Sequence, residues 1–147
     1  RCFNRFVTAQ NLYSLLDRGV EKEVIPACQR YGLGILPYFP LASGLLTGKY
    51  IRGKEPPKGT RLASWGDRAK SALSDHNFDI LEKLSSFAEE KGHSLLELAM
   101  SWLASQRQIS SVIAGATSPK QVQQNAQAAS WRLSDEEMKE VDRIVQS

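Results

Sequence analysis

Residues 5–38 constrain the fold more than any other stretch, because two short strand patterns flank a helical one. The segment 5–10, "RFVTAQ", has the β-branched and aromatic residues of a strand. Apolar residues then recur at helical spacing, at Val20, Val24, Cys28 and Tyr31. Pro26 should perturb the first turns of this helix, and Gly32 is a typical stop. The apolar residues 33–38 predict a second, buried strand, and therefore a βαβ unit with parallel strands.

A long polar connection and two helices are predicted next. Residues 51–75 are rich in glycine, proline and charge without a sustained period, and connections of that length are usually functional or disordered. A helix is predicted over about 76–91, with an apolar side. Another begins at Ser94, because Ser94 and Glu97 have the spacing of a capping box.

The strand and helix pattern returns in the last third of the chain. The segment "SSVIAG", 110–115, predicts a third strand, and a helix follows with Ser118 as N-cap and Pro119 at its first position. A final helix is predicted behind a second capping box, Ser134 to Glu137. The chain therefore reads as an α/β fold with three β/α units and parallel strands.

Composition bounds the function classes. The net charge of +3 and the pI near 9 arise from basic residues interspersed with acidic ones, which favours solvated helix faces over a nucleic-acid surface. The only cysteines, Cys2 and Cys28, have no metal-ligand spacing, so we expect a reduced, cytoplasmic chain without a metal site. No apolar run reaches the roughly 20 residues of a membrane span, and no signal-peptide pattern opens the chain.

The predicted strand ends carry residues suited to a ligand, and ligands of α/β folds sit at the carboxyl ends of parallel strands. Gln10 can pair reciprocally with a primary carboxamide, although it could equally hydrogen-bond in a turn. The ring of Tyr38 is suited to stacking on a planar heterocycle, although a strand tyrosine can also be a core residue. Gly115 leaves room for a ligand at the third strand end.

The stretch behind Tyr38 indicates an anion site. Pro40 stops the strand, and residues 41–45, "LASGL", would bring unobstructed backbone N–H groups and the Ser43 hydroxyl close to a phosphate, with Lys49 adding a charge. The helix that starts near Ser118 would point its N–H groups at the same space. A Rossmann glycine fingerprint after a strand, a Walker motif, a nucleophile elbow and a histidine constellation are all missing from the sequence.

Three motifs resemble one family. "PYFPLASGLLTGKY", then "KGTR", then "SSVIAGATSPKQVQQN" are similar, in this order, to the carboxyl-terminal part of the aldo-keto reductases, which are (β/α)8 TIM-barrel NADPH oxidoreductases. The resemblance covers nearly the whole chain. It implies that residues 1–147 are a partial barrel domain containing strands six, seven and eight, the cofactor-binding portion.

The resemblance also implies a role for each matching position. Gln10 would hold the nicotinamide carboxamide, Tyr38 would stack on the nicotinamide ring, and Arg61 would hold the adenosine 2′-phosphate. The loop 51–75 would fold over the bound cofactor. The implied cofactor-binding residues are Gln10, Tyr38, Phe39, Pro40, Leu41, Ala42, Ser43, Gly44, Lys49, Arg61, Gly115, Thr117, Gln121, Gln124 and Asn125. Of these, the stretch from Pro40 to Gly44 with Lys49 would follow the pyrophosphate, Thr117 and Gln121 would assist Arg61, and Gln124 and Asn125 would meet the adenine.

Two departures limit what the family resemblance implies. Many relatives carry a basic residue where this chain has Thr117, so the grip on the 2′-phosphate would depend more on Arg61 and on the N-terminus of the helix that starts near Ser118. The catalytic tyrosine, lysine, aspartate and histidine of the family lie on earlier strands that this chain does not contain, so no residue here is assigned a catalytic role.

The expected function is the NADPH-binding portion of an aldo-keto reductase. When complete with its amino-terminal barrel portion, the protein would reduce a small aldehyde or ketone, whereas the chain alone would be inactive. The alternatives are a regulatory NADPH-binding protein that resembles the potassium-channel β-subunits, and an unrelated phosphate-binding barrel fragment.

Overall fold

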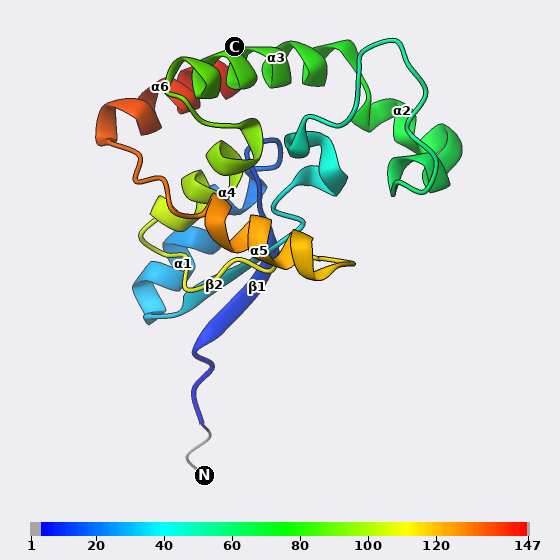
Figure 1. The fold of residues 1–147 in the computed structure, drawn as a ribbon. Helices are drawn as coiled ribbons and strands as arrows, with labels where there is room; N and C mark the ends of the chain where they lie inside the picture. Colours follow the sequence, from blue (N-terminus) through cyan, green and yellow to red (C-terminus); the bar gives the residue numbers. More distant parts are fainter. Residues whose placement is uncertain (1–3, 147) are drawn as a thin grey trace.

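The computed structural model describes residues 4–146, except for the side chain of Arg68. Its elements are β1 (Thr8–Leu12), η1 (Gly19–Glu21), α1 (Val24–Tyr31), β2 (Gly34–Tyr38), η2 (Ala42–Thr47), η3 (Leu62–Arg68), α2 (Ala69–Ala72), α3 (Asp75–Glu90), α4 (Leu95–Ser105), α5 (Pro119–Ala128) and α6 (Asp135–Gln146). Figure 1 shows the two strands at one side of the molecule, with α3 and α6 side by side at the opposite side and α4 between. None of the helices in this part of the chain is both long and apolar enough to cross a membrane.

The predicted βαβ unit is present. Strands β1 and β2 pair in parallel from Thr8 opposite Gly34 to Leu12 opposite Tyr38, with α1 between them in the chain. Helix α1 ends where predicted, because Gly32 takes the left-handed conformation (φ 67°) and its N–H donates to the last turn. The first strand starts three residues later than predicted and ends two residues later, since pairing with β2 runs from Thr8 to Leu12.

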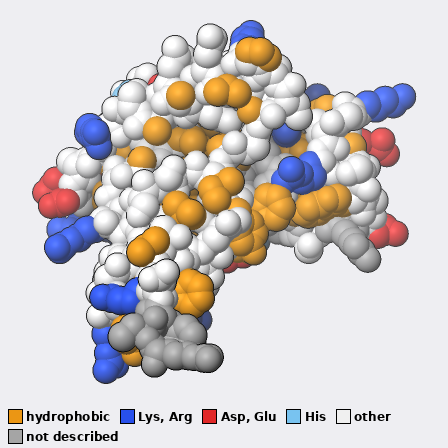
Figure 2. Space-filling model, turned by 90° about the horizontal axis from the view of Figure 1, so that it is seen from below, with side chains coloured by type: hydrophobic (Ala, Val, Ile, Leu, Met, Phe, Trp, Pro, Cys, Tyr) orange, Lys and Arg blue, Asp and Glu red, His pale blue; other side chains and the backbone are white. Residues whose placement is uncertain are grey.

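The two faces of this sheet differ in exposure. Side chains alternate along a strand, so Ile35 and Pro37 share one face and are buried beneath the helices. Gln10, Leu36 and Tyr38 lie on the opposite, open face, where Gln10 is exposed and Leu36 and Tyr38 are half-buried. Figure 2 looks at the molecule from below and shows hydrophobic side chains spread across its surface among lysines and arginines.

The predicted third strand, 110–115, runs along β2 but is not a continuous strand. Two isolated parallel bridges join it to β2, from Ile35 to Ile109 and from Tyr38 to Ile113. The N–H of Ser110 donates to the carbonyl of Ile35 (3.0 Å), but the next bond comes one residue later than a regular ladder requires, from Ile113 to the carbonyl of Pro37 (2.9 Å). Pro37 has no N–H to donate, which interrupts the ladder between the two bridges and allows the one-residue slip. The regular sheet among the described residues has therefore two strands.

The core lies among α3, α4, α6 and the turns after the strands. Helix α4 begins at the predicted capping box: the Ser94 hydroxyl accepts from the Glu97 N–H, and the Glu97 carboxylate accepts from the Ser94 N–H. The second box holds α6 in the same way, between Ser134 and Glu137. Trp102 of α4 is fully buried, together with Leu84 of α3 and Val141 of α6. Helix–helix packing therefore supports the face of the sheet opposite Tyr38.

The connection 51–75 is folded to a greater extent than predicted. It contains η3 and the short helix α2, and it is held by the buried side chain of Leu62. Arg52 at its start is surrounded by three carboxylates of the α3 segment. Their contacts are Asp75 at 3.3 Å, Asp79 at 2.5 Å and Glu82 at 3.1 Å. The loop is thus fixed to α3 at one end.

Candidate functional site

The carboxyl end of β2 presents two adjacent aromatic rings. Tyr38 is the last residue of the strand, as predicted, and its ring meets the ring of Phe39 edge to face, with centroids 5.4 Å apart. Phe39 is 41% exposed and lies at a φ of 53°. The rings of Tyr38 and Phe39 are therefore partly exposed to solvent and do not belong to the core.

The turn behind Tyr38 has an unusual backbone. Phe39, Ala42, Ser43 and Gly44 all have positive φ values, of 53°, 44°, 58° and 95°. Such values cost side-chain-bearing residues of the order of 1 kcal/mol each, and they cluster at ligand sites in proteins. The N–H groups of Ala42 and Gly44 donate within the turn, to the carbonyls of Phe39 and Leu41. The expectation that the N–H groups of this stretch are unobstructed is therefore wrong for these two.

Lys49 lies directly across Gly44. A Cβ atom added at Gly44 would come within 2.6 Å of the Cε and Nζ atoms of Lys49, so only glycine leaves room for the ammonium group in this place. Two bonds hold the turn in shape, from the Thr47 hydroxyl to the carbonyl of Gly44 (2.7 Å) and from the Tyr50 hydroxyl to that of Ser43 (3.3 Å). The positive charge of Lys49 thus lies beside the left-handed turn, as an anion site requires.

Arg61 joins this turn from the long loop. Its Cζ atom lies over the ring of Phe39, 4.9 Å from the centroid. The sequence separates these two residues by the whole η2 turn and half of the loop 51–75. The structure thus brings Arg61 against the residue that follows Tyr38, a contact that the sequence did not predict.

Gln10 is placed differently from the prediction. It lies in the middle of β1, opposite Leu36, and Leu12 ends the strand. Gln10 nevertheless shares the open face of the sheet with Tyr38, because both belong to the same alternating set. Gln10 is exposed on this face.

The start of α5 is built as predicted. The Ser118 hydroxyl accepts from the Gln121 N–H at 3.3 Å, and Pro119 occupies the first turn. The Gln121 side-chain oxygen accepts from the N–H (2.7 Å) and the hydroxyl (3.0 Å) of Thr117, so these two residues form one unit. A Cβ added at Gly115 would meet nothing within 4 Å.

The two predicted adenine-contacting residues have different surroundings. Gln124 is exposed on α5. Asn125 lines a cavity of about 380 Å³ between α4, α5 and the segment 109–116, with Met100, Val112 and Val122 among its other walls. Gln124 therefore faces solvent, whereas Asn125 is half-buried and faces this cavity.

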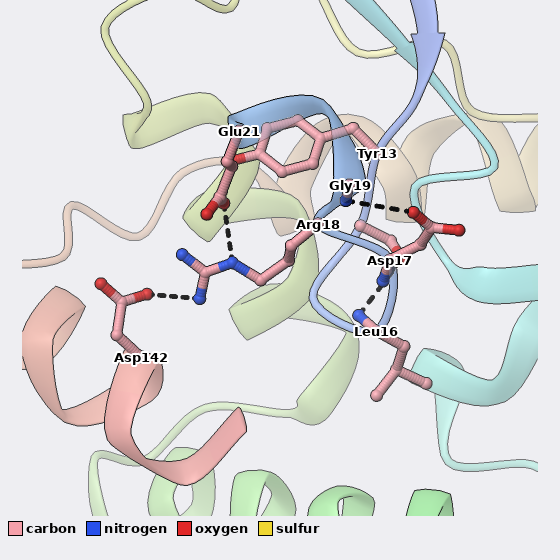
Figure 3. Close-up of polar contacts among 8 residues, drawn as sticks. Tyr13, Leu16, Asp17, Arg18, Gly19, Glu21 and Asp142 are labelled. Atoms are coloured by element: carbon pink, nitrogen blue, oxygen red, sulfur yellow. Dashed lines mark hydrogen bonds and ion pairs between the residues drawn. The ribbon is translucent and has the colours of Figure 1, made fainter. Parts of the chain in front are cut away.

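A partly buried polar cluster lies away from this site and was not predicted. Figure 3 shows Arg18 between Glu21 and Asp142, with contacts of 2.7 and 2.6 Å. The hydroxyl of Tyr13 donates to Glu21 at 2.7 Å, and Arg18 also lies 5.0 Å over the ring of Trp102. No local pattern could have revealed it, because Arg18 and Asp142 are 124 positions apart. In the described part of the chain, no group of histidine, cysteine and acidic side chains could hold a metal ion.

The pKa values of the cluster agree with a structural role. Burial raises the pKa of Tyr13 far above its usual value, and the hydrogen bond to Glu21 adds to this effect. Burial alone would lower the pKa of Arg18, but its bonds to Glu21 and Asp142 outweigh burial and raise that pKa. Tyr13 is therefore held protonated and Arg18 charged, which suits an anchor and not a proton-transfer group.

Comparisons with known proteins agree on one family. The model of the aldo/keto reductase family matches residues 3–146. The chain is 34% identical over 142 residues to an L-glyceraldehyde 3-phosphate reductase of Escherichia coli O157:H7, covering 92% of this chain and 40% of that protein. It is 37% identical over 145 residues to a probable voltage-gated potassium channel subunit beta of Oryza sativa subsp. japonica, covering 96% and 44%.

Two further matches bear on cofactor and fold. An NADH-specific methylglyoxal reductase of Escherichia coli (strain K12) is 33% identical over 126 residues, covering 86% of this chain and 38% of that protein. The solved structure of the glycerol dehydrogenase AKR11B4 from Gluconobacter oxydans superposes with a TM-score of 0.78 at 29% identity, covering 94% of this chain and 42% of that one. The chain spans about two fifths of the length of these relatives.

Proposed function

Because this chain belongs to the aldo-keto reductase family, we propose that it is the NADPH-binding portion of an oxidoreductase that reduces small aldehydes or ketones to alcohols. The complete protein would be built as a (β/α)8 barrel, with this chain supplying its last three β/α units. Reductases among the relatives support this reaction class.

One observation carries the proposal: the ring of Tyr38, the left-handed turn with Lys49, and Arg61 are adjacent at one strand end. A dinucleotide presents a flat ring, a pyrophosphate and an adenosine, and these residues match the first two groups in type and order. The residues present therefore fit a nicotinamide dinucleotide. When bound, such a cofactor supplies the hydride.

Each residue then has a binding role. Tyr38 stacks on the nicotinamide ring and fixes the face that is turned toward the substrate, while Gln10 on the same sheet face pairs with the carboxamide. Lys49 neutralises the pyrophosphate beside Ser43 and Gly44. The residues assigned to the cofactor are those of the sequence prediction: Gln10, Tyr38, Phe39, Pro40, Leu41, Ala42, Ser43, Gly44, Lys49, Arg61, Gly115, Thr117, Gln121, Gln124 and Asn125.

The choice of NADPH over NADH depends on Arg61. Its guanidinium is the charged group best suited to a 2′-phosphate here, assisted by the Thr117 and Gln121 pair at the start of α5. Because the methylglyoxal reductase among the relatives is named as NADH-specific, a preference for NADH is the alternative outcome.

The proton that completes carbonyl reduction comes from outside this chain in our proposal. The family resemblance assigns the proton donor to strands that precede β1, so the amino-terminal barrel portion is the required partner. The outer edge of β1 and the segment 109–113 would pair with it. With Cys28 free and buried, a reducing, cytoplasmic location suits the chain.

A regulatory role is the second candidate, because potassium channel β-subunits are also among the relatives. In that case cofactor binding would regulate a protein partner, and turnover of carbonyl substrates would be slow or absent.

The experiment is to purify the complete native protein that carries this chain and to titrate it with NADPH. The protein is then mixed with reactive aldehydes, and NADPH absorbance is followed. Binding with turnover supports the reductase, binding without turnover on any carbonyl favours the regulatory protein, and no binding of either NADPH or NADH rejects both.

A further inference from the structure

The contact between Phe39 and Arg61 joins two parts of the candidate site that the sequence keeps apart. The Cζ atom of Arg61 lies over the face of the Phe39 ring, 4.9 Å from its centroid. The ring itself is held in place, because it packs edge to face on Tyr38 and its carbonyl accepts the Ala42 N–H at 2.9 Å. The Phe39 ring, supported by Tyr38, thus lies beneath the long side chain of Arg61.

Three arginines of the described chain, Arg18, Arg52 and Arg143, are paired with carboxylates. Arg18 is bound by Glu21 and Asp142, and Arg52 by three acidic residues of the α3 segment. Among the residues that the structure describes, no carboxylate lies within ion-pair distance of the Arg61 side chain, whose described contact is the Phe39 ring. The guanidinium of Arg61 therefore keeps its donors for a ligand.

Stacking and phosphate binding use different parts of a guanidinium. The ring contacts its flat face, whereas its five N–H donors point outward in its plane, where a phosphate accepts two of them at once. A stacked arginine has also lost part of its rotamer freedom before the ligand arrives, which raises affinity. The two contacts therefore reinforce each other.

We propose that Phe39 is a positioning residue that holds Arg61 in the orientation that receives the 2′-phosphate of NADPH, and so helps to set the preference for NADPH over NADH. This inference rests on the proposed function. It assigns to Phe39 a role distinct from that of Tyr38, since Phe39 acts through Arg61 and not through the nicotinamide.

The test compares dissociation constants of NADPH and NADH for the complete native protein and its Phe39→Leu variant. Loss of an exposed cation–π contact should weaken NADPH binding about three- to fivefold more than NADH binding. In an Arg61→Ala background, Phe39→Leu should no longer change the ratio of the two constants. Phe39→Tyr keeps the ring face and should preserve the wild-type ratio of the two constants.

Tyr31 provides a matched control, because it is an exposed aromatic residue beneath Arg30 (5.6 Å) on α1, outside the candidate site. Tyr31→Leu should leave both constants unchanged. The ratio of the two constants does not depend on the fraction of folded protein, so a destabilised variant still gives an answer.

The outcomes separate the inference from the proposed function. Equal losses for both cofactors, tighter NADPH binding, or additive losses in the double variant would overturn the role of Phe39 while leaving the cofactor site intact. Wild-type protein that binds neither dinucleotide would overturn the proposed function, and the inference with it.

Discussion

Arg18 and Asp142 form an ion pair of 2.6 Å that joins the turn after β1 to the last helix, α6. Because Arg18 also binds Glu21 and covers Trp102, this pair connects the sheet side of the molecule with the helical core. The carboxyl end of the chain therefore takes part in fixing the strand that carries Gln10.

The first prediction concerns the stability of this connection. Arg18→Met should lower the free energy of unfolding by about 1–3 kcal/mol, a range set below that of fully buried pairs because Asp142 is partly exposed. Urea unfolding of the complete protein measures it. Arg143→Met is the matched control on α6, since Arg143 pairs with Glu140 at the surface, and it should cost less than about 0.5 kcal/mol. Equal costs for both variants would contradict the role given to Arg18.

The second prediction concerns Arg61 itself. A charge-assisted hydrogen bond contributes roughly 1.5–3 kcal/mol, so Arg61→Ala should weaken NADPH by about ten- to a hundredfold and NADH little. Fluorescence titration with both cofactors measures it. If the two affinities fell together, Arg61 would not be a 2′-phosphate ligand.

The third prediction separates stacking from chemistry at Tyr38. Tyr38→Phe keeps the ring and should leave turnover nearly unchanged, whereas Tyr38→Ala should loosen the cofactor and slow hydride transfer. Steady-state and single-turnover kinetics of the complete protein distinguish the two effects. An inactive Tyr38→Phe variant would show that the hydroxyl takes part in the reaction.

The fourth prediction concerns the chain alone. Purified without an amino-terminal portion, it should reduce no carbonyl compound, because a barrel of this kind needs typically about 250 residues and a proton donor within hydrogen-bond reach of the substrate. Phe6, Val7 and Ile113 are exposed near the open strand edges and favour self-association. NADPH absorbance with reactive aldehydes, before and after addition of the amino-terminal portion, measures it. Robust turnover by the isolated chain would contradict the proposal.

The fifth prediction is a pH effect at the start of α4. The N–H and hydroxyl of Ser94 hold the pKa of Glu97 below its ordinary value of 4.5. A carboxylate with a depressed folded-state pKa stabilises the protein above its unfolded-state pKa and loses that contribution as the pH falls through the folded value. Glu97→Gln should therefore flatten the fall in Tm below about pH 4.5. Melting curves from pH 3 to pH 7 measure it, and parallel curves for both proteins would contradict it.

Local rules predicted the helices well. The Ser94, Ser118 and Ser134 caps, and the stop at Gly32, are all present, because capping depends on residues a few positions apart. Strand limits depend on partners distant in the sequence, so the first strand was predicted to start three residues and to end two residues too early. The Arg18 and Asp142 pair depends wholly on the tertiary fold, as does the position of Phe39 beneath Arg61.

The gap in the hydrogen-bond ladder at Pro37 shifts by one residue the pairing of the neighbouring segment with β2, and so changes which of its side chains lie on each face of the sheet. Ile109 pairs with Ile35 on the helix side of the sheet. If the pairing continued residue by residue, Val112 would lie opposite Tyr38. The skipped residue reverses that order: Val112 packs against the core, while Ile113 pairs with Tyr38 and lies 41% exposed. The missing N–H of Pro37 thus accompanies a one-residue register shift, and this shift places Ile113 instead of Val112 beside Tyr38 at the candidate site.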